Sequence, residues 1–266
     1  MRYLFTVLYI FTTLPVINPV NLKPFYDQYN LNGSFIISGT GNQGYTVYNE
    51  SLINTKITPA STFNIITTLI ALEDGICSNG ETRITWPARN ASDTNNNVTL
   101  AYAFQHNIDL AFWTLRKKIG KDRMNYWLGK LHYGNSVLPA SVDSTNGTDE
   151  FWVVSSRLQI TPLQQMQLIK DLYSYRLPFS TSSIQKVKTF MYQKDIKGYS
   201  IYGKRGSYRL AGGNQYIGWF IGYAENKQHV YFFVNYLTTG NLSHPSIVDA
   251  QKNIVYNIFS ATHLLK

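Results

Sequence analysis

The fold of this chain is decided by two adjoining segments, Pro59-Ala-Ser-Thr-Phe-Asn-Ile65 and Leu69-Ile-Ala-Leu-Glu-Asp-Gly75. A helix is predicted from about Ser61 to Asp74, because a proline precedes it and a glycine, the typical residue after a helix, follows it. The residues in between are apolar on nearly every side, which indicates a helix buried in a core. The two segments therefore predict a central helix that carries a serine at its N-terminal end.

Turn residues and apolar patterns around this helix predict a mixed α+β fold. The expected strands are 33–39, 45–48, 199–204, 216–224 and 229–236. The expected helices, besides the central one, are 100–119, 122–131, 161–175, 183–193 and 247–261. Since the last three strands follow one another as a meander, the sheet is predicted to be antiparallel, with five strands and with helices on its faces.

The composition bounds the class of protein. Of the 266 residues, 44% are hydrophobic and 15% are charged, which is typical of a globular chain. Lys and Arg outnumber Asp and Glu by 24 to 15, and the resulting net charge of +9 favours an anionic partner. No dense run of Lys or Arg occurs, so nucleic acid is not expected as that partner. No internal apolar stretch reaches the roughly 18 residues of a membrane span, which excludes a multispanning protein.

The cysteine and histidine content predicts neither a disulfide nor a metal centre. The only cysteine is Cys77, which follows the apolar helix and is expected to be a small core residue. The five histidines are scattered, and none has the spacing of a zinc site. We therefore expect no metal and no cofactor.

Residues 1–18 are predicted to be a signal-like leader. Met1-Arg2 supplies one positive charge, and an apolar run interrupted by threonines follows as far as Ile17. Such a run is too short and too polar for a membrane span and is typical of a signal-peptide core. The alternative is a buried first strand or helix. No typical cleavage site follows at Asn18-Pro19. Export to the periplasm or cell envelope is expected.

Beyond the leader, the chain resembles class D serine β-lactamases of the penicillin-binding protein superfamily. The resemblance rests on the two opening segments and on Ala103-Phe-Gln105, Ile119-Gly-Lys-Asp-Arg-Met124, Tyr133-Gly-Asn135, Phe151-Trp152, Leu158-Gln-Ile-Thr-Pro162, Tyr202-Gly-Lys204, Gly206 and Gly218-Trp-Phe-Ile-Gly-Tyr223. It implies a β-lactamase/penicillin-binding transpeptidase-like fold over residues 19–266. Such a fold has an antiparallel five-stranded sheet flanked by helices, plus a helical subdomain.

The resemblance also implies a set of catalytic positions. In this chain, the position of the family's general base does not hold the expected lysine. An acyl-transfer site needs a nucleophile and a base that activates it. In the family a Ser-x-x-Lys motif supplies both, because its lysine is carbamylated and acts as the general base. Here Ser61 stands at the nucleophile position and Asn64 replaces the lysine. An asparagine amide cannot be carbamylated and does not act as a base near neutral pH.

Other family positions differ as well. Asn107 and Asp109 replace the two defining residues of a Ser-x-Val motif, and Arg205 replaces the threonine of Lys-Thr-Gly. The family's carboxylate-binding arginine falls at about Gln251. Arg205 is expected either to contact an anionic ligand or to block the cleft.

Several family positions are retained. The backbone N–H groups of Ser61 and Ser207 are expected to form an oxyanion hole. The retained family residues are Ser61, Trp152, Tyr133, Gly134, Asn135, Lys204 and Gly206.

Three functions remain open from the sequence. The first is a hydrolytically impaired homologue, or pseudoenzyme, that still binds β-lactam or peptidoglycan-like ligands. The second is an active hydrolase or acyl transferase that uses Ser61 with Asp109 as a rearranged base. The third is a scaffold or interaction protein. No oligomeric state is predicted.

Overall fold

The computed structural model describes residues 17–41, 44–88, 96–136, 158–210, 215–239 and 247–265. Its main element is a seven-stranded sheet with the order β1-β3-β2-β9-β8-β7-β6. The strands are β1 (Ile17–Pro19), β2 (Asn32–Gly39), β3 (Tyr45–Tyr48), β6 (Tyr192–Ile196), β7 (Tyr199–Arg209), β8 (Tyr216–Glu225) and β9 (Val230–Thr238).

The sheet is larger than the five strands predicted. The five predicted strands are present as β2, β3, β7, β8 and β9, and their pairings with one another are antiparallel. The sixth strand, β6, begins at Tyr192 and Gln193, which were predicted to end the helix 183–193. It forms a hairpin with β7 through Lys197 and Gly198, whose φ angles of 49° and 78° are those of a type I′ turn. The seventh strand, β1, pairs in parallel with β3. Its first residues overlap the segment predicted as a signal-like leader, and that leader stays a prediction.

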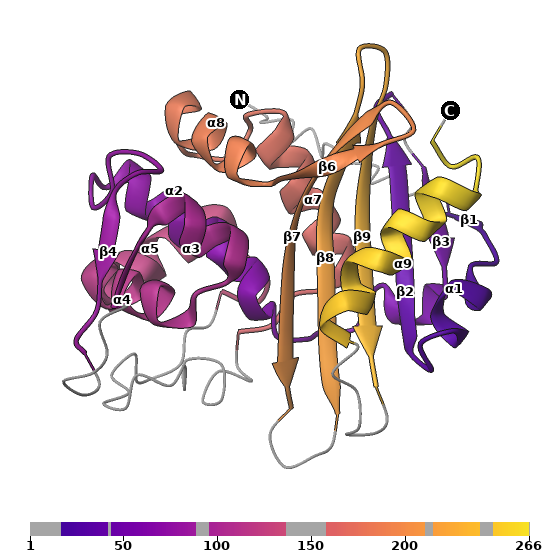
Figure 1. The fold of residues 1–266 in the computed structure, drawn as a ribbon, viewed down its shortest axis with the longest axis horizontal. Helices are drawn as coiled ribbons and strands as arrows, with labels where there is room; N and C mark the ends of the chain where they lie inside the picture. The colour runs from indigo at the N-terminus through magenta and orange to yellow at the C-terminus, as the bar shows by residue number, and fades with distance from the viewer. Residues whose placement is uncertain are drawn as a thin grey trace, which may run out of the picture.

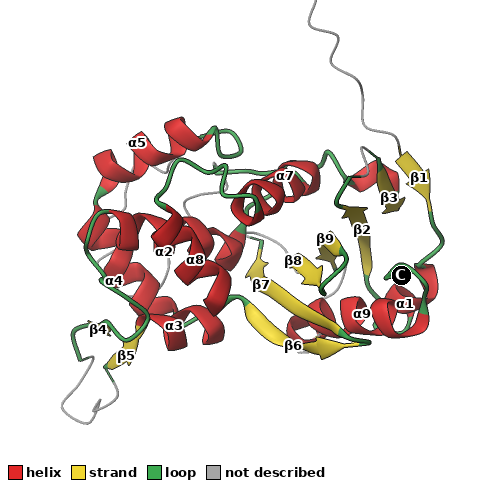
Figure 2. Cartoon of the chain, turned by 90° about the horizontal axis from the view of Figure 1, so that it is seen from above, coloured by secondary structure: helices red, strands yellow, loops and turns green. Residues whose placement is uncertain are grey.

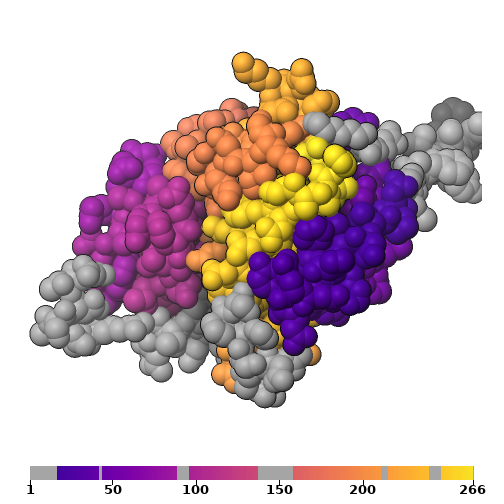
Figure 3. All heavy atoms as spheres, turned by 45° about the vertical axis from the view of Figure 1, so that its right-hand side comes forward, coloured from indigo at the N-terminus to yellow at the C-terminus, as the bar shows by residue number. Residues whose placement is uncertain are grey.

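Helices cover both faces of the sheet (Figure 2). One face contacts α7 (Pro162–Tyr173), which begins at the capping box of Thr161 and Gln164. The other face contacts α9 (Ile247–Ala261), and α1 (Lys23–Asp27) packs against α9. In the space-filling view α9 crosses this face between the N-terminal elements and the β6–β7 hairpin (Figure 3). No helix of the described segments combines the length and the apolar character needed to cross a bilayer.

A helical subdomain lies beside the β7 end of the sheet (Figure 1). Its helices are α2 (Asn64–Glu73), α3 (Leu100–His106), α4 (Asp109–Ile119), α5 (Lys121–Leu131) and α8 (Thr181–Phe190). Two short strands, β4 (Arg83–Thr85) and β5 (Asn97–Thr99), form a separate antiparallel pair. Short 3-10 turns η1 (Glu50–Leu52) and η2 (Ala60–Phe63) precede α2.

The helix predicted at 100–119 is two helices. α3 ends at His106 and α4 begins at Asp109, because Asn107 adopts a left-handed conformation with φ 54°. Asparagine tolerates that conformation better than most residues and often ends helices in this way. The break turns the chain, so that Asn107 faces β7 instead of continuing along a helix.

The central helix is buried, as predicted. Every residue of α2 except Glu73 is buried, and the helix lies in the larger of two apolar clusters. That cluster joins the helical subdomain to the sheet through residues such as Trp219 and Ile221 of β8. The smaller cluster lies under α9 on the other face. The N-terminal end of α2 therefore lies at the junction of subdomain and sheet.

Candidate active site

Ser61 lies in η2, the turn that leads into α2. Its neighbours Thr62 and Phe63 are fully buried, whereas Ser61 is partly exposed. The Thr62 hydroxyl donates to Pro59 O at 2.6 Å and accepts from the Gln165 amide at 2.8 Å. These bonds fix the η2 turn at Thr62, while the neighbouring Ser61 remains partly exposed.

The backbone of β7 approaches this turn closely. β6 pairs with β7 only as far as Tyr202, so the following residues of β7 form an edge of the sheet. A Cβ added to Gly206 would lie 2.7 Å from Thr62 N and 2.9 Å from Ser61 N. Only a glycine permits this approach, and Ser207 is the next residue. The arrangement agrees with the expected oxyanion hole of the Ser61 and Ser207 N–H groups, which stays a prediction.

Asn64 is held by a buried arginine. Its side chain is 2% exposed, and its Oδ1 accepts a hydrogen bond from Arg116 Nη1 at 3.4 Å. Arg116 comes from α4 and is itself 2% exposed. The position of the family's base therefore holds an amide and a guanidinium, and neither takes up a proton near neutral pH.

Arg116 was missed by the sequence analysis. Helical periodicity could have identified Arg116 as buried, because position 116 falls on the apolar face of its helix. The other members of that buried face are Ala111, Phe112, Leu115 and Ile119. A basic residue on an otherwise apolar face indicates a buried charge with a specific partner.

Lys204 is also buried, and Asn107 holds it. Lys204 Nζ donates to Phe104 O at 2.8 Å and to Asn107 Oδ1. Asn107 Nδ2 donates in turn to Arg205 O at 3.3 Å. The residue aligned with the serine of Ser-x-Val therefore bridges α3 and β7 and contacts the strand lysine.

The charges around Lys204 are mostly positive. Burial, reinforced by the positive charges of Arg205 and Lys252, holds the pKa of Lys204 well below its usual 10.5. Asp109 acts in the opposite direction and raises it. Asp109 is exposed in the first turn of α4. Its carboxylate is therefore close enough to Lys204 to act on it electrostatically, while remaining in contact with solvent.

Arg205 lies on the opposite face of β7 from Lys204. Its partner across the strands is Phe220, whose ring packs against Tyr256 of α9 at 5.9 Å between ring centroids. Lys252 of α9 is close by, and its pKa is lowered by burial and then by Arg205. Cross-strand neighbours share a face of a sheet, so Arg205 belongs to the face covered by α9. Whether it contacts a ligand stays a prediction.

Gln251 of α9 packs against β8 at Gly218. It is fully buried, and a Cβ at Gly218 would lie 3.0 Å from its Cγ and Nε2. Gly218 pairs with Ser207. In the described part of the chain, the Gln251 amide has no hydrogen-bond partner. A neutral amide therefore stands where the resemblance expects a carboxylate-binding arginine.

The Tyr133-Gly134-Asn135 motif forms a turn that holds the chain before α7. The Tyr133 ring packs on Phe63 at 5.3 Å between centroids, and burial raises the pKa of its hydroxyl. Gly134 has a φ of 55°, and a Cβ there would overlap Gln159 O. Asn135 Oδ1 accepts from Gln159 N at 3.0 Å. A role in substrate binding stays a prediction, and Trp152 lies outside the described residues.

This geometry can be compared with known proteins. Residues 22–260 match the family model described as "Penicillin binding protein transpeptidase domain". The chain belongs to this transpeptidase family. Its fold is that of class D β-lactamases, so the resemblance stated from the sequence is confirmed.

Relatives of this transpeptidase family include both receptors and β-lactamases. The regulatory protein BlaR1 of Bacillus licheniformis is 30% identical over 79% of this chain, but the match spans only 34% of BlaR1. The probable β-lactamase YbxI of Bacillus subtilis is 32% identical over 76% of this chain and 73% of its own.

Two solved structures have the same fold. The C-terminal domain of the Bacillus licheniformis BlaR penicillin-receptor superposes with a TM-score of 0.80 at 26% identity, covering 93% of this chain and 97% of that domain. Class D β-lactamase BAT-2 has a TM-score of 0.76 at 30% identity, with the same coverage.

We predict that Gly206→Ala destabilises the protein by about 1–3 kcal/mol, because the added methyl group overlaps the Thr62 and Ser61 backbone. Urea unfolding followed by circular dichroism measures the change. Gly129→Ala is the matched control. No atom lies within 4 Å of its added Cβ, and alanine favours the α5 helix by about 0.5–1 kcal/mol. Equal stability of Gly206→Ala and the wild type would contradict the close approach.

We further predict that raising the pH stabilises the wild type relative to Lys204→Met. The unfolded lysine titrates near 10.5 and the folded one below it, so the unfolded state binds more protons in that window. The difference in free energy of unfolding should therefore rise as the pH is raised toward 10.5, by at most about 1.4 kcal/mol per pH unit. Lys227→Met, which removes an exposed lysine, controls for the loss of one charge. A flat or falling difference would contradict the lowered pKa.

Proposed function

We propose that this chain binds β-lactam or peptidoglycan-like ligands at Ser61 and hydrolyses β-lactams negligibly. The observation that carries the proposal is the buried pair of Asn64 and Arg116 at the position of the family's base. The penicillin-binding family and the structural similarity to a penicillin-receptor domain support ligand binding.

The proposed lack of turnover follows from the chemistry of acylation. The step would join Ser61 Oγ to the β-lactam carbonyl carbon and break the ring C–N bond. The serine proton would have to reach the ring nitrogen. A general base that carries this proton contributes roughly 10²–10⁴-fold in rate. The Asn64 amide and the Arg116 guanidinium cannot carry it, and hydrolysis of an acyl-enzyme needs a base again.

Asp109 is the alternative base, and its surroundings do not favour that role. A useful base near neutral pH needs a raised pKa, which burial would provide. Asp109 is exposed at the start of α4 and lies within the electrostatic reach of Lys204. An active hydrolase is therefore the less favoured function.

We also propose that the protein is exported to the periplasm or cell envelope. The signal-like pattern of residues 1–18 supports this, because one basic residue precedes a short apolar run. The ligands proposed for the cleft are encountered in that compartment.

The proposal is tested by a chromogenic cephalosporin assay together with intact-mass analysis after incubation with a penicillin. We expect turnover within twofold of the Ser61→Ala variant and no stimulation by bicarbonate, since position 64 holds an asparagine in place of the lysine that is carbamylated in the family. We also expect saturable penicillin binding by calorimetry. A stable adduct on Ser61 would show covalent binding, which also supports the proposal. Turnover comparable to that of a class D enzyme would overturn it, and absence of any binding would favour a scaffold.

A second prediction concerns Asn64→Lys. This change alone should not restore efficient turnover, because Asn107, Asp109 and Arg205 still differ from the family pattern. The new side chain must also displace the Arg116 guanidinium, which lies 3.4 Å from Asn64 Oδ1. Cephalosporin turnover is measured with and without bicarbonate, using Asn64→Gln as the matched control. Rescue by this single change to class D rates would show that the other departures are harmless.

A further inference from the structure

We propose a second binding site, for a neutral saccharide, in a cavity at the other end of β7 from the Ser61 turn. The cavity has a volume of about 400 Å³ and is lined by residues of α3, α8, β6, β7 and β8. Its walls include Gln105, Lys188, Tyr192, Tyr202, Tyr223 and Glu225. A volume of this size is within the range of small-ligand sites.

One wall is built from packed tyrosines. Tyr202 and Tyr223 stack with their ring centroids 4.8 Å apart at 14°, and Tyr192 meets Tyr202 edge-on at 5.6 Å. Tyr192 is 44% exposed, so part of its ring remains open to solvent. A pyranose ring presents a face of C–H groups that packs on an aromatic ring, while its hydroxyls point outward to hydrogen-bond. Rigid aromatic rings with polar tips suit this mixed surface.

The charges of the cavity balance each other. Lys188 Nζ lies 4.2 Å from the Tyr173 ring centroid and donates to Tyr173 O at 3.2 Å. Glu225 Oε2 accepts from the Tyr173 hydroxyl at 2.9 Å. One cation and one anion are thus both engaged by the same residue. The cavity therefore offers polar groups without net charge, which favours a neutral ligand rich in hydroxyls over an ion.

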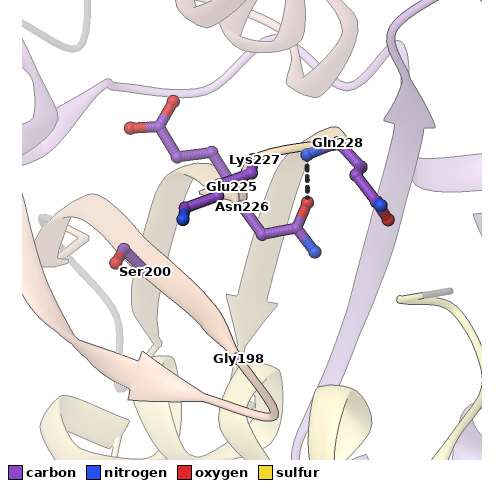
Figure 4. A pocket seen from close by; sticks show the side chains of 6 residues that line it. All are labelled: Gly198, Ser200, Glu225, Asn226, Lys227 and Gln228. Atoms are coloured by element: carbon purple, nitrogen blue, oxygen red, sulfur yellow. Dashed lines mark hydrogen bonds between the residues drawn. The ribbon is translucent and has the colours of Figure 1, made fainter.

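A neighbouring hollow lacks these features. Glu225 lines it as well, and it has a volume of about 660 Å³ (Figure 4). Its other lining residues are Gly198, Ser200, Asn226, Lys227 and Gln228, which belong to two hairpin tips and include no aromatic ring. It offers no stacking surface, so the saccharide is assigned to the tyrosine cavity.

The position of the cavity relative to Ser61 follows from the alternation of side chains along β7. Tyr202, Lys204 and Gly206 alternate with other residues and so share one face of β7. Gly206 meets the Ser61 turn, whereas Tyr202 lines the cavity. Four residues of strand correspond to about 13 Å. Lys204 and its contact with Phe104 lie between the two, so saccharide binding does not depend on chemistry at Ser61.

The test uses the full chain and two trisaccharides, β-1,4-linked N-acetylglucosamine trimer and cellotriose. Saturation-transfer NMR and calorimetry should detect saturable binding of at least one, with a dissociation constant in the millimolar range or below. Preference between them tells whether an acetamido group contributes. Tyr192→Ala should weaken binding at least tenfold, and Gln105→Ala should weaken it severalfold.

Tyr126→Ala is the matched control, because Tyr126 is 51% exposed on α5, outside the set of cavity-lining residues. It should bind within twofold of the wild type. Circular dichroism checks that each variant is folded. Absence of saturable binding by both trisaccharides would overturn the proposal. So would equal affinity of Tyr192→Ala and the wild type.

Discussion

The contact between β7 and the η2 turn is the constraint on which the rest of the site depends. Gly206 brings the edge of the sheet against the backbone of Ser61 and Thr62. Bonds from Thr62 and Gln165 fix the other side of the turn. The backbone at Ser61 is thus positioned by packing against Gly206 and by the hydrogen bonds of its neighbour Thr62. Changes in the surrounding side chains can alter the chemistry of the site while leaving its shape intact.

The side chains of the site combine buried cations with amides. Arg116 donates to Asn64, and Lys204 donates to Asn107. Burying a charge is costly, and hydrogen bonds to amide oxygens offset only part of that cost. Positive charge of this kind suits the recognition of an anionic ligand. A group that accepts a proton from the serine is a separate requirement, which the Asn64 amide and the Arg116 guanidinium do not meet.

Much of the fold could be predicted because its signals are local. The apolar residues of α2, the Thr161 cap and the C-terminal meander each have a pattern that the sequence shows directly. The missed features depend on tertiary context. The break at Asn107 occurs within a continuous helical pattern, and Arg116 is defined by a partner 52 positions away. Ser61 and Lys204 could be identified as site residues only through resemblance to a family. The hydrogen bond between Asn64 and Arg116 could be found only in the structure.

Ser61 and Gly206 are in contact but far apart in the sequence, and this separation affects the order in which the protein folds. About 145 residues lie between Ser61 and Gly206, and the helical subdomain is made entirely of this intervening chain. Contacts so distant in sequence carry a large loop-closure entropy and form slowly. The nucleophile position is therefore expected to be completed late, after α2 and the β7–β9 meander have formed on their own. A newly made chain would pass through a compact stage in which Ser61 has no strand beside it.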